Sequence, residues 1–145
     1  MNAKAKNSFS SVCLSVTLGL IFLLAGFGKL LSPPTFYQNI LEYRLLDSQS
    51  SWLLAHYLPW LECLLGLALM TAFLRPGALL LATMLCLLFL LVLASVWLRG
   101  LNISCGCFAG GGWLDSVPVA MLKNILMLAA MTMLWVKSGA RLRSA

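Results

Sequence analysis

Four long apolar runs, each long enough to cross a membrane as a helix, dominate this sequence. They occupy residues 12–31, 53–74, 77–98 and 117–136. About 20 apolar residues in a helix span the roughly 30 Å hydrocarbon core of a bilayer. Backbone polar groups cannot stay unpaired in lipid, so such runs must be helical or part of a closed barrel. The sequence therefore predicts an all-α integral membrane protein, a single domain over residues 1–145 with four transmembrane helices in a bundle.

The composition supports the same class. Hydrophobic residues make up 61% of the chain and charged residues 10%, whereas about 25% of residues are charged in a typical soluble domain. The net charge of +6 does not indicate nucleic-acid binding, because the basic residues lie at the ends of apolar runs and form no patch. We therefore expect the lipid bilayer as the surroundings of this protein and no nucleic-acid partner.

The distribution of basic residues predicts the orientation in the membrane. Lys and Arg are enriched on the cytoplasmic side of membrane segments, and four spans place both termini on one side. The basic residues on that side are Lys4, Lys6, Arg75, Lys137, Arg141 and Arg143. Those on the other side are Lys29, Arg44, Arg99 and Lys123. We therefore predict cytoplasmic termini in a bacterial inner membrane, with the connection of residues 99–116 facing the periplasm.

A polar interval separates the first two runs. Pro33 and Pro34 end the first helix, because proline lacks an N–H and restricts the residue before it. Over residues 35–51, Phe36, Ile40 and Tyr43 recur at roughly helical spacing with polar residues between them. This pattern favours an amphipathic segment lying in the membrane interface. A plain surface loop is the alternative.

The predicted periplasmic connection contains two thiols one residue apart, Cys105 and Cys107. Residues i and i+2 of an extended backbone point to the same side, and Gly106 permits the bend that would bring the two sulfurs together. A disulfide in such a small ring would be strained and easily reduced, which suits thiol–disulfide exchange. The periplasm is an oxidising compartment. We predict that Cys105 and Cys107 are catalytic, one forming a mixed disulfide and the other resolving it.

Other uses of these cysteines stay open. One is a structural disulfide with another cysteine, and another is capture of Cu(I) by the two thiolates, with His56 as a further ligand. The remaining cysteines, Cys13, Cys63 and Cys86, lie in apolar runs, where a lone cysteine packs as a small hydrophobe. We predict no resident metal and no obligatory cofactor. Whether a quinone accepts the electrons stays open. A quinone-linked oxidase usually needs a second thiol pair, and the sequence does not show whether any two of Cys13, Cys63 and Cys86 meet.

Three charged residues lie within the apolar runs at similar depth. Lys29 is near the outer end of the first run, and Glu62 and Lys123 are in the outer halves of the second and fourth. Because a charge in hydrocarbon is costly, such residues face the bundle interior and pair with one another. We predict a supporting ion-paired cluster beneath the cysteine connection, where a cation would favour the reactive thiolate. Alternatively, the lysines extend to the interface.

Several short motifs together resemble a known family. They are Ala25-Gly26-x-x-Lys29, Tyr43, Leu58-Pro59-x-x-Glu62 with Gly66, and Arg99-Gly100 ahead of Cys105-Gly106-Cys107-Phe108. With them the chain resembles the MauE family of methylamine-utilisation membrane proteins, within the wider DoxX-like group of four-helix membrane proteins, from about residue 18 to 123. The family pattern has glycine directly after the phenylalanine, whereas Ala109 intervenes here before Gly110. The turn geometry at this point is therefore open.

The resemblance implies a role in maturing methylamine dehydrogenase, whose small subunit is rich in disulfides, beside a periplasmic thioredoxin-like protein. It also marks Arg99, Gly106 and Phe108 as residues that shape the connection. We therefore predict thiol–disulfide exchange that supports disulfide formation in exported client proteins. The alternative, from a different class, is a non-enzymatic scaffold or Cu(I)-handling protein that recruits a thioredoxin-like enzyme.

Overall fold

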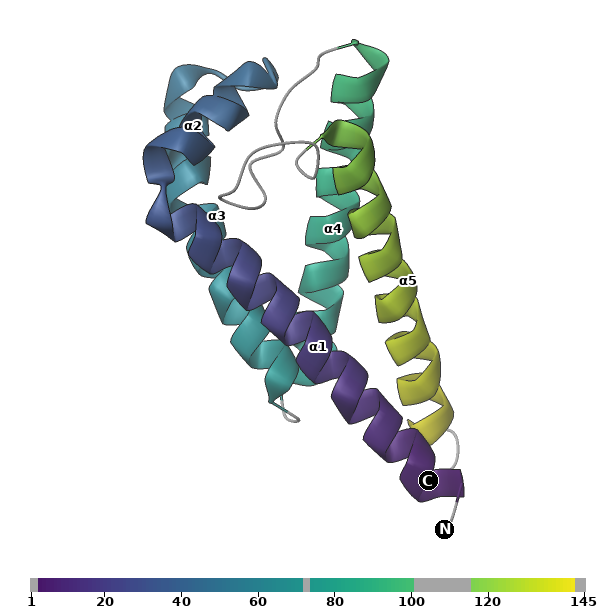
Figure 1. Ribbon diagram of the computed structural model, residues 1–145. Coiled ribbons are helices and arrows are strands. Elements are labelled where there is room, and N and C mark those ends of the chain that lie inside the picture. Colours follow the sequence, from purple (N-terminus) through teal and green to yellow (C-terminus); the bar gives the residue numbers. More distant parts are fainter. Residues whose placement is uncertain (1–2, 72–73, 101–115, 143–145) are drawn as a thin grey trace.

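The computed structural model describes residues 3–71, 74–100 and 116–142, and these ranges are almost entirely helical (Figure 1). The helices are α1 (Ala3–Leu31), α2 (Pro33–Glu42), α3 (Ser48–Met70), α4 (Arg75–Leu98) and α5 (Val117–Leu142). No strand occurs within the described ranges. The predicted all-α class is confirmed.

Four helical segments are long and apolar enough to cross a membrane. They are Phe9–Leu31, Ser48–Met70, Arg75–Leu98 and Val117–Lys137. The second lies nearer the N-terminus than the predicted run of residues 53–74. Its start is set by Asp47, whose side chain accepts hydrogen bonds from the backbone N–H groups of Gln49 and Ser50 and so caps the helix. Its end is set by Thr71, whose backbone is extended.

The first part of the polar interval after the first span forms a helix, α2 (Pro33–Glu42), and residues 43–47 form an irregular turn before α3. Pro33 and Pro34 occupy its first turn, where a missing N–H costs nothing because those N–H groups have no intrahelical partner. Phe36 and Ile40 are buried against Ala55 of α3. The amphipathic pattern is therefore helical as far as Glu42, and the apolar face of this helix packs on α3.

The four spans form two pairs, with α1 beside α3 and α4 beside α5 (Figure 1). Glycine sets the closeness of the first pair. A Cβ added to Gly19 would lie 2.7 Å from the carbonyl oxygen of Gly66, and a Cβ added to Gly66 would lie 2.7 Å from that of Gly19. Small residues let helix backbones approach in this way, and in lipid such packing is a main source of helix association.

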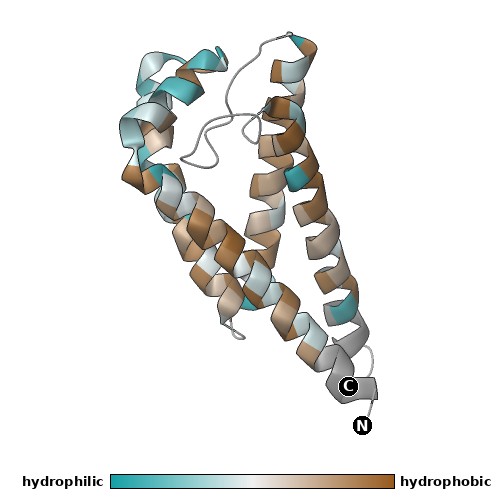
Figure 2. Ribbon diagram, viewed as in Figure 1, coloured by the Kyte–Doolittle hydropathy of each residue, from teal (hydrophilic) through white to brown (hydrophobic). Residues whose placement is uncertain are grey.

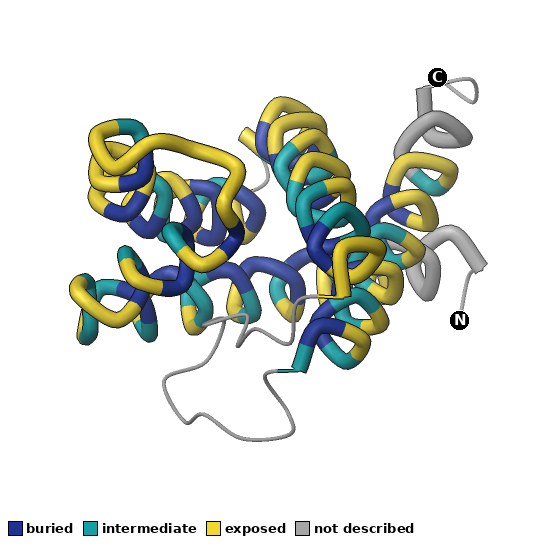
Figure 3. The backbone as a smooth tube through the Cα atoms, turned by 90° about the horizontal axis from the view of Figure 1, so that it is seen from above, coloured by how far each residue is buried: buried dark blue, intermediate teal, exposed yellow. Residues whose placement is uncertain are grey.

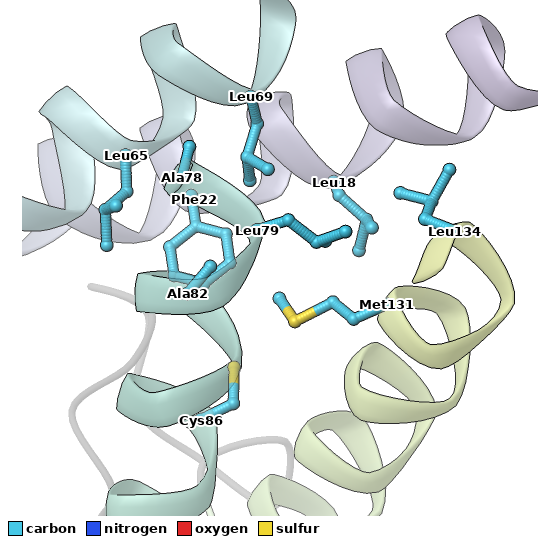
Figure 4. Packing of buried hydrophobic residues seen from close by; sticks show 10 residues of the cluster. All are labelled: Leu18, Phe22, Leu65, Leu69, Ala78, Leu79, Ala82, Cys86, Met131 and Leu134. Atoms are coloured by element: carbon cyan, nitrogen blue, oxygen red, sulfur yellow. The ribbon is translucent and has the colours of Figure 1, made fainter. Parts of the chain in front are cut away.

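A buried apolar cluster joins all four spans in the half of the bundle that holds the start of α1 and the end of α5. Figure 4 shows its members: Leu18, Phe22, Leu65, Leu69, Ala78, Leu79, Ala82, Cys86, Met131 and Leu134. Nearby, Ser15 donates a hydrogen bond of 2.6 Å to the carbonyl of Leu69. Lys137 donates one of 2.9 Å to the Ser10 hydroxyl, so the start of α1 and the end of the fourth span meet at one end of the bundle.

The outward surfaces of the spans are apolar, unlike those of a soluble bundle (Figure 2). Large hydrophobic side chains such as Leu24, Leu91 and Val136 are more than half exposed. Figure 3 shows exposed positions along the outer sides of the helices and buried ones toward their contacts. Lipid covers such a surface in a membrane protein, so this pattern agrees with the four spans.

Candidate functional site

Lys29 and Glu62 form an ion pair inside the bundle. The Lys29 ammonium lies 2.5 Å from the Glu62 Oε1 atom. Only 4% of Lys29 and 8% of Glu62 is exposed. Charges removed from water are tolerated when they pair, and in a membrane such residues face the interior of the bundle. The structure therefore brings together two of the three charged residues that the sequence places at similar depth.

A close crossing one helical turn away positions this pair. A Cβ added to Gly26 of α1 would lie 2.8 Å from both the Pro59 carbonyl oxygen and the Cys63 sulfur of α3. Lys29 follows Gly26 by three residues, and Glu62 follows Pro59 by three. Residues three apart lie nearly one turn apart on one helix face. The two motifs Gly-x-x-Lys and Pro-x-x-Glu are therefore the two halves of one helix contact.

Aromatic rings from two further helices surround the Lys29 ammonium. It lies 5.2 Å from the centre of the Phe36 ring of α2 and 6.0 Å from that of the Phe89 ring of α4. The face of an aromatic ring attracts a cation at such distances. Lys29 thereby links α1 to three other helices, including α3 through Glu62.

The second oxygen of the Glu62 carboxylate has no such support. Oε2 is buried and has no hydrogen-bond partner within the described part of the chain. An unsatisfied buried acceptor is costly, by about 1–3 kcal/mol or more for a charged group. Such a group is a natural contact point for a ligand that can donate a hydrogen bond.

Lys123, the third charged residue, lies on α5 and lines the same cavity as Lys29 and Glu62. Beside it, Asn124 is buried and donates a 3.0 Å hydrogen bond to the carbonyl of Cys86 on α4. Sequence reasoning did not single out Asn124. Its position next to Lys123 in an otherwise apolar run is the signal that could have identified it, because buried polar side chains need partners.

The cavity between α1, α3, α4 and α5 has a volume of about 450 Å³. Its polar end is formed by Lys29, Glu62, Lys123 and Asn124, and Phe89 lines it nearby. Its other end reaches Leu14 and Ala130 and is mostly apolar, with Thr17, whose hydroxyl donates to the Cys13 carbonyl, among its lining. Since Leu14 and Lys29 are both on α1, a rise of 1.5 Å per residue makes the distance between these ends roughly 20 Å. The cavity is thus long and amphipathic.

The predicted catalytic residues Cys105 and Cys107, with Gly106 and Phe108, lie outside the described residues. The start of their segment is described. Arg99, just after α4, donates a 3.2 Å hydrogen bond from Nη1 to the carbonyl of Tyr43 at the end of α2. Gly100 follows with a positive φ of 67°, a conformation that favours glycine. The chain therefore enters the cysteine segment from an anchored point.

The remaining cysteines differ in their surroundings. Cys13 is exposed, Cys63 is half-buried and Cys86 is buried, and these three described cysteines are free thiols. His56 is exposed, its Nδ1 lies 3.0 Å from the carbonyl of Trp52 and its ring lies 4.2 Å from the Trp52 ring. Residues 3–71, 74–100 and 116–142 contain no group of three or more His, Cys, Asp or Glu side chains able to hold a metal ion.

Comparison with known proteins identifies the family that this chain matches. Residues 7–137 match the family described as methylamine utilisation protein MauE. The curated methylamine utilization protein MauE of Paracoccus denitrificans is 32% identical over 117 residues, which cover 80% of this chain. The match spans 63% of that relative's length, less than two thirds. No solved structure matches the chain.

Proposed function

This chain belongs to the MauE family of methylamine utilisation proteins, and from that premise we propose that it exchanges thiols and disulfides at the periplasmic face of a bacterial inner membrane. One observation carries the proposal. Cys105 and Cys107 stand one residue apart in the segment that joins two membrane spans, α4 and α5. Two thiols so close in the sequence can form a disulfide with each other, and a segment between two spans gives them access to a soluble partner, as exchange requires.

The bonds, electrons and protons of the exchange balance with a single dithiol partner. A thiolate of a thioredoxin-like protein attacks one sulfur of the Cys105–Cys107 disulfide, breaks that bond and forms a mixed disulfide. The second partner thiolate then attacks the mixed disulfide and releases this protein as a dithiol. Two electrons and two protons pass to Cys105 and Cys107, and the partner gains a disulfide. The same steps in reverse would reduce the partner.

The polar groups of the bundle support this chemistry in two ways. Arg99 fixes the start of the cysteine segment through its bond to Tyr43. Lys29, which pairs with Glu62, is in the last turn of α1, and α1 ends in the half of the bundle where α4 ends and α5 begins (Figure 1). A nearby cation such as Lys123, which lies six residues into α5, would favour a thiolate over a thiol.

The partners follow from the family name and the chemistry. The relative's name links it to methylamine utilisation, so we propose an exported protein of that process, with methylamine dehydrogenase as the first candidate client. A soluble thioredoxin-like protein would carry disulfides between the membrane and this client.

Trapping a covalent adduct tests the proposal. Cys105→Ser and Cys107→Ser, expressed singly, each leave one thiol that can hold a mixed disulfide. We expect at least one of them to give an adduct with a thioredoxin-like protein or client on a non-reducing gel. The adduct should disappear with reductant and in the double variant. Cys13→Ser is the matched control, because it removes an exposed thiol on a span and should trap nothing.

No adduct with either single variant, together with one Cu(I) bound per wild-type protein, would contradict exchange and favour metal handling.

A further inference from the structure

The cavity between the four spans has the shape and chemistry of a site for a lipophilic ligand with a polar head. Its volume of about 450 Å³ is in the range of small-molecule pockets, roughly 300–1,000 Å³. Apolar side chains line most of its length, and Lys29, Glu62, Lys123 and Asn124 gather near one end. The exchange steps proposed above assign no role to this space.

The polar end requires a head group that donates as well as accepts hydrogen bonds. Glu62 Oε2 is buried without a partner among the described residues, so a ligand with a hydrogen-bond donor would satisfy it. Lys29 and Asn124 offer N–H groups at the same end, and an ammonium or an amide can donate to a carbonyl oxygen. The Phe89 ring lies on the wall here, where it can contact a flat ring face to face or by its edge.

These features exclude some lipids and favour one class. The ionised phosphate of a phospholipid has no hydrogen to donate to Glu62 Oε2, so it would leave that buried acceptor without a partner. Two acyl chains also exceed a cavity of this size. A quinone head is neutral and flat, its carbonyl oxygens accept hydrogen bonds, and its reduced form has hydroxyl groups that donate them. Its single isoprenoid tail fits the apolar length toward Leu14 and Ala130.

We propose that this cavity binds a lipophilic quinone and its quinol, with the ring at Glu62, Lys29 and Asn124 and the tail along α1 and α5. The quinol hydroxyl donates to Glu62 Oε2, and a ring oxygen accepts from the N–H groups opposite. This binding site stands independently of the thiol exchange proposed above.

Filling the cavity tests the site, and α5 offers a matched pair of positions. Ala130 lines the cavity, whereas its neighbour Ala129 is exposed on the outer side. Ala130→Phe should therefore block the tail region, and Ala129→Phe should add the same side chain facing lipid. A second filling variant, Ala25→Leu, acts from α1 in case Ala130→Phe does not fold. Circular dichroism and gel filtration check the fold of each variant.

The measurement is equilibrium binding of ubiquinol carrying a two-isoprene tail, kept reduced because only this form can donate to Glu62 Oε2, to purified protein in zwitterionic nanodiscs, with empty nanodiscs as the blank. We expect saturable one-to-one binding to wild type and Ala129→Phe, and at least a tenfold loss of affinity in the folded filling variants. Phosphatidylglycerol added to the discs should not compete. The proposal is overturned if wild type shows no saturable binding, if the filling variants bind as wild type does, or if phosphatidylglycerol displaces the quinol.

Discussion

The buried carboxylate of Glu62 accepts a 2.5 Å hydrogen bond from the Lys29 ammonium, and this bond joins the end of α1 to the middle of α3. The Gly26–Pro59 contact one turn away brings the two helices close enough for this bond. The pair therefore belongs to the packing of α1 on α3 as much as to the polar end of the cavity. Its removal should affect stability, which allows a direct test.

Breaking one half of the pair should cost more than removing both charges. Glu62→Met leaves the Lys29 ammonium buried without its partner, and such a loss costs about 3–5 kcal/mol. Lys29→Met combined with Glu62→Met replaces the pair by apolar side chains of similar volume and should recover most of that loss. The free energies of unfolding of wild type, both single variants and the double variant form a double-mutant cycle. A double variant as unstable as the sum of the two singles would show that the residues do not interact.

Even a methyl side chain at Gly66 should destabilise the protein. Its Cβ would meet the Gly19 carbonyl oxygen at 2.7 Å, whereas a Cβ on Gly28 would meet nothing within 4 Å. Alanine is favoured over glycine in a helix by about 1 kcal/mol, so Gly28→Ala should be neutral or stabilising. Gly66→Ala should destabilise by about 1–3 kcal/mol through overpacking. Thermal unfolding in detergent measures both, and equal effects of the two substitutions would contradict the close crossing.

Arg99→Gln should slow thiol exchange while leaving the fold intact. It removes the hydrogen bond to the Tyr43 carbonyl and frees the start of the cysteine segment, so we expect a several-fold lower rate of mixed-disulfide formation. Arg44→Gln is the matched control, because it removes an exposed arginine on the same side of the protein. Gel-based kinetics with a thioredoxin-like partner provide the rate. Equal rates for the two variants would mean that charge alone, not the Tyr43 contact, matters.

The Asp47 cap of α3 should make the stability of the protein depend on pH in the acid range. Hydrogen bonds from the Ser50 side chain and backbone hold the pKa of Asp47 below its usual range. A lowered pKa in the folded state stabilises the fold above the unfolded value of about 3.9, and this contribution is lost as pH falls through the folded value. The Tm difference between wild type and Asp47→Ala should therefore be largest near neutral pH and shrink below about pH 4. A difference that is constant from pH 7 to pH 3 would exclude the ionised cap.

The sequence predicts the helical class well, because hydropathy alone determines which segments can span lipid. It places Lys29, Glu62 and Lys123 at similar depth, since depth follows from position along a run. It does not determine how each helix is rotated about its axis, and rotation decides that Glu62 binds Lys29. The same limit hides the Asn124 bond to Cys86 and the cavity, because both depend on how side chains from different helices meet. The burial of Phe36 and Ile40 likewise depends on α2 folding back onto α3.

The central claim, a redox-active Cys105–Cys107 pair on the periplasmic side, is tested most directly by thiol labelling in intact cells. A variant with Cys13, Cys63 and Cys86 changed to serine leaves only these two thiols. A membrane-impermeant maleimide should label them after the cells are treated with reductant, and much less before, because part of the pair exists as a disulfide. Labelling that appears only after the membrane is permeabilised, or that is the same with and without reductant, would contradict the claim.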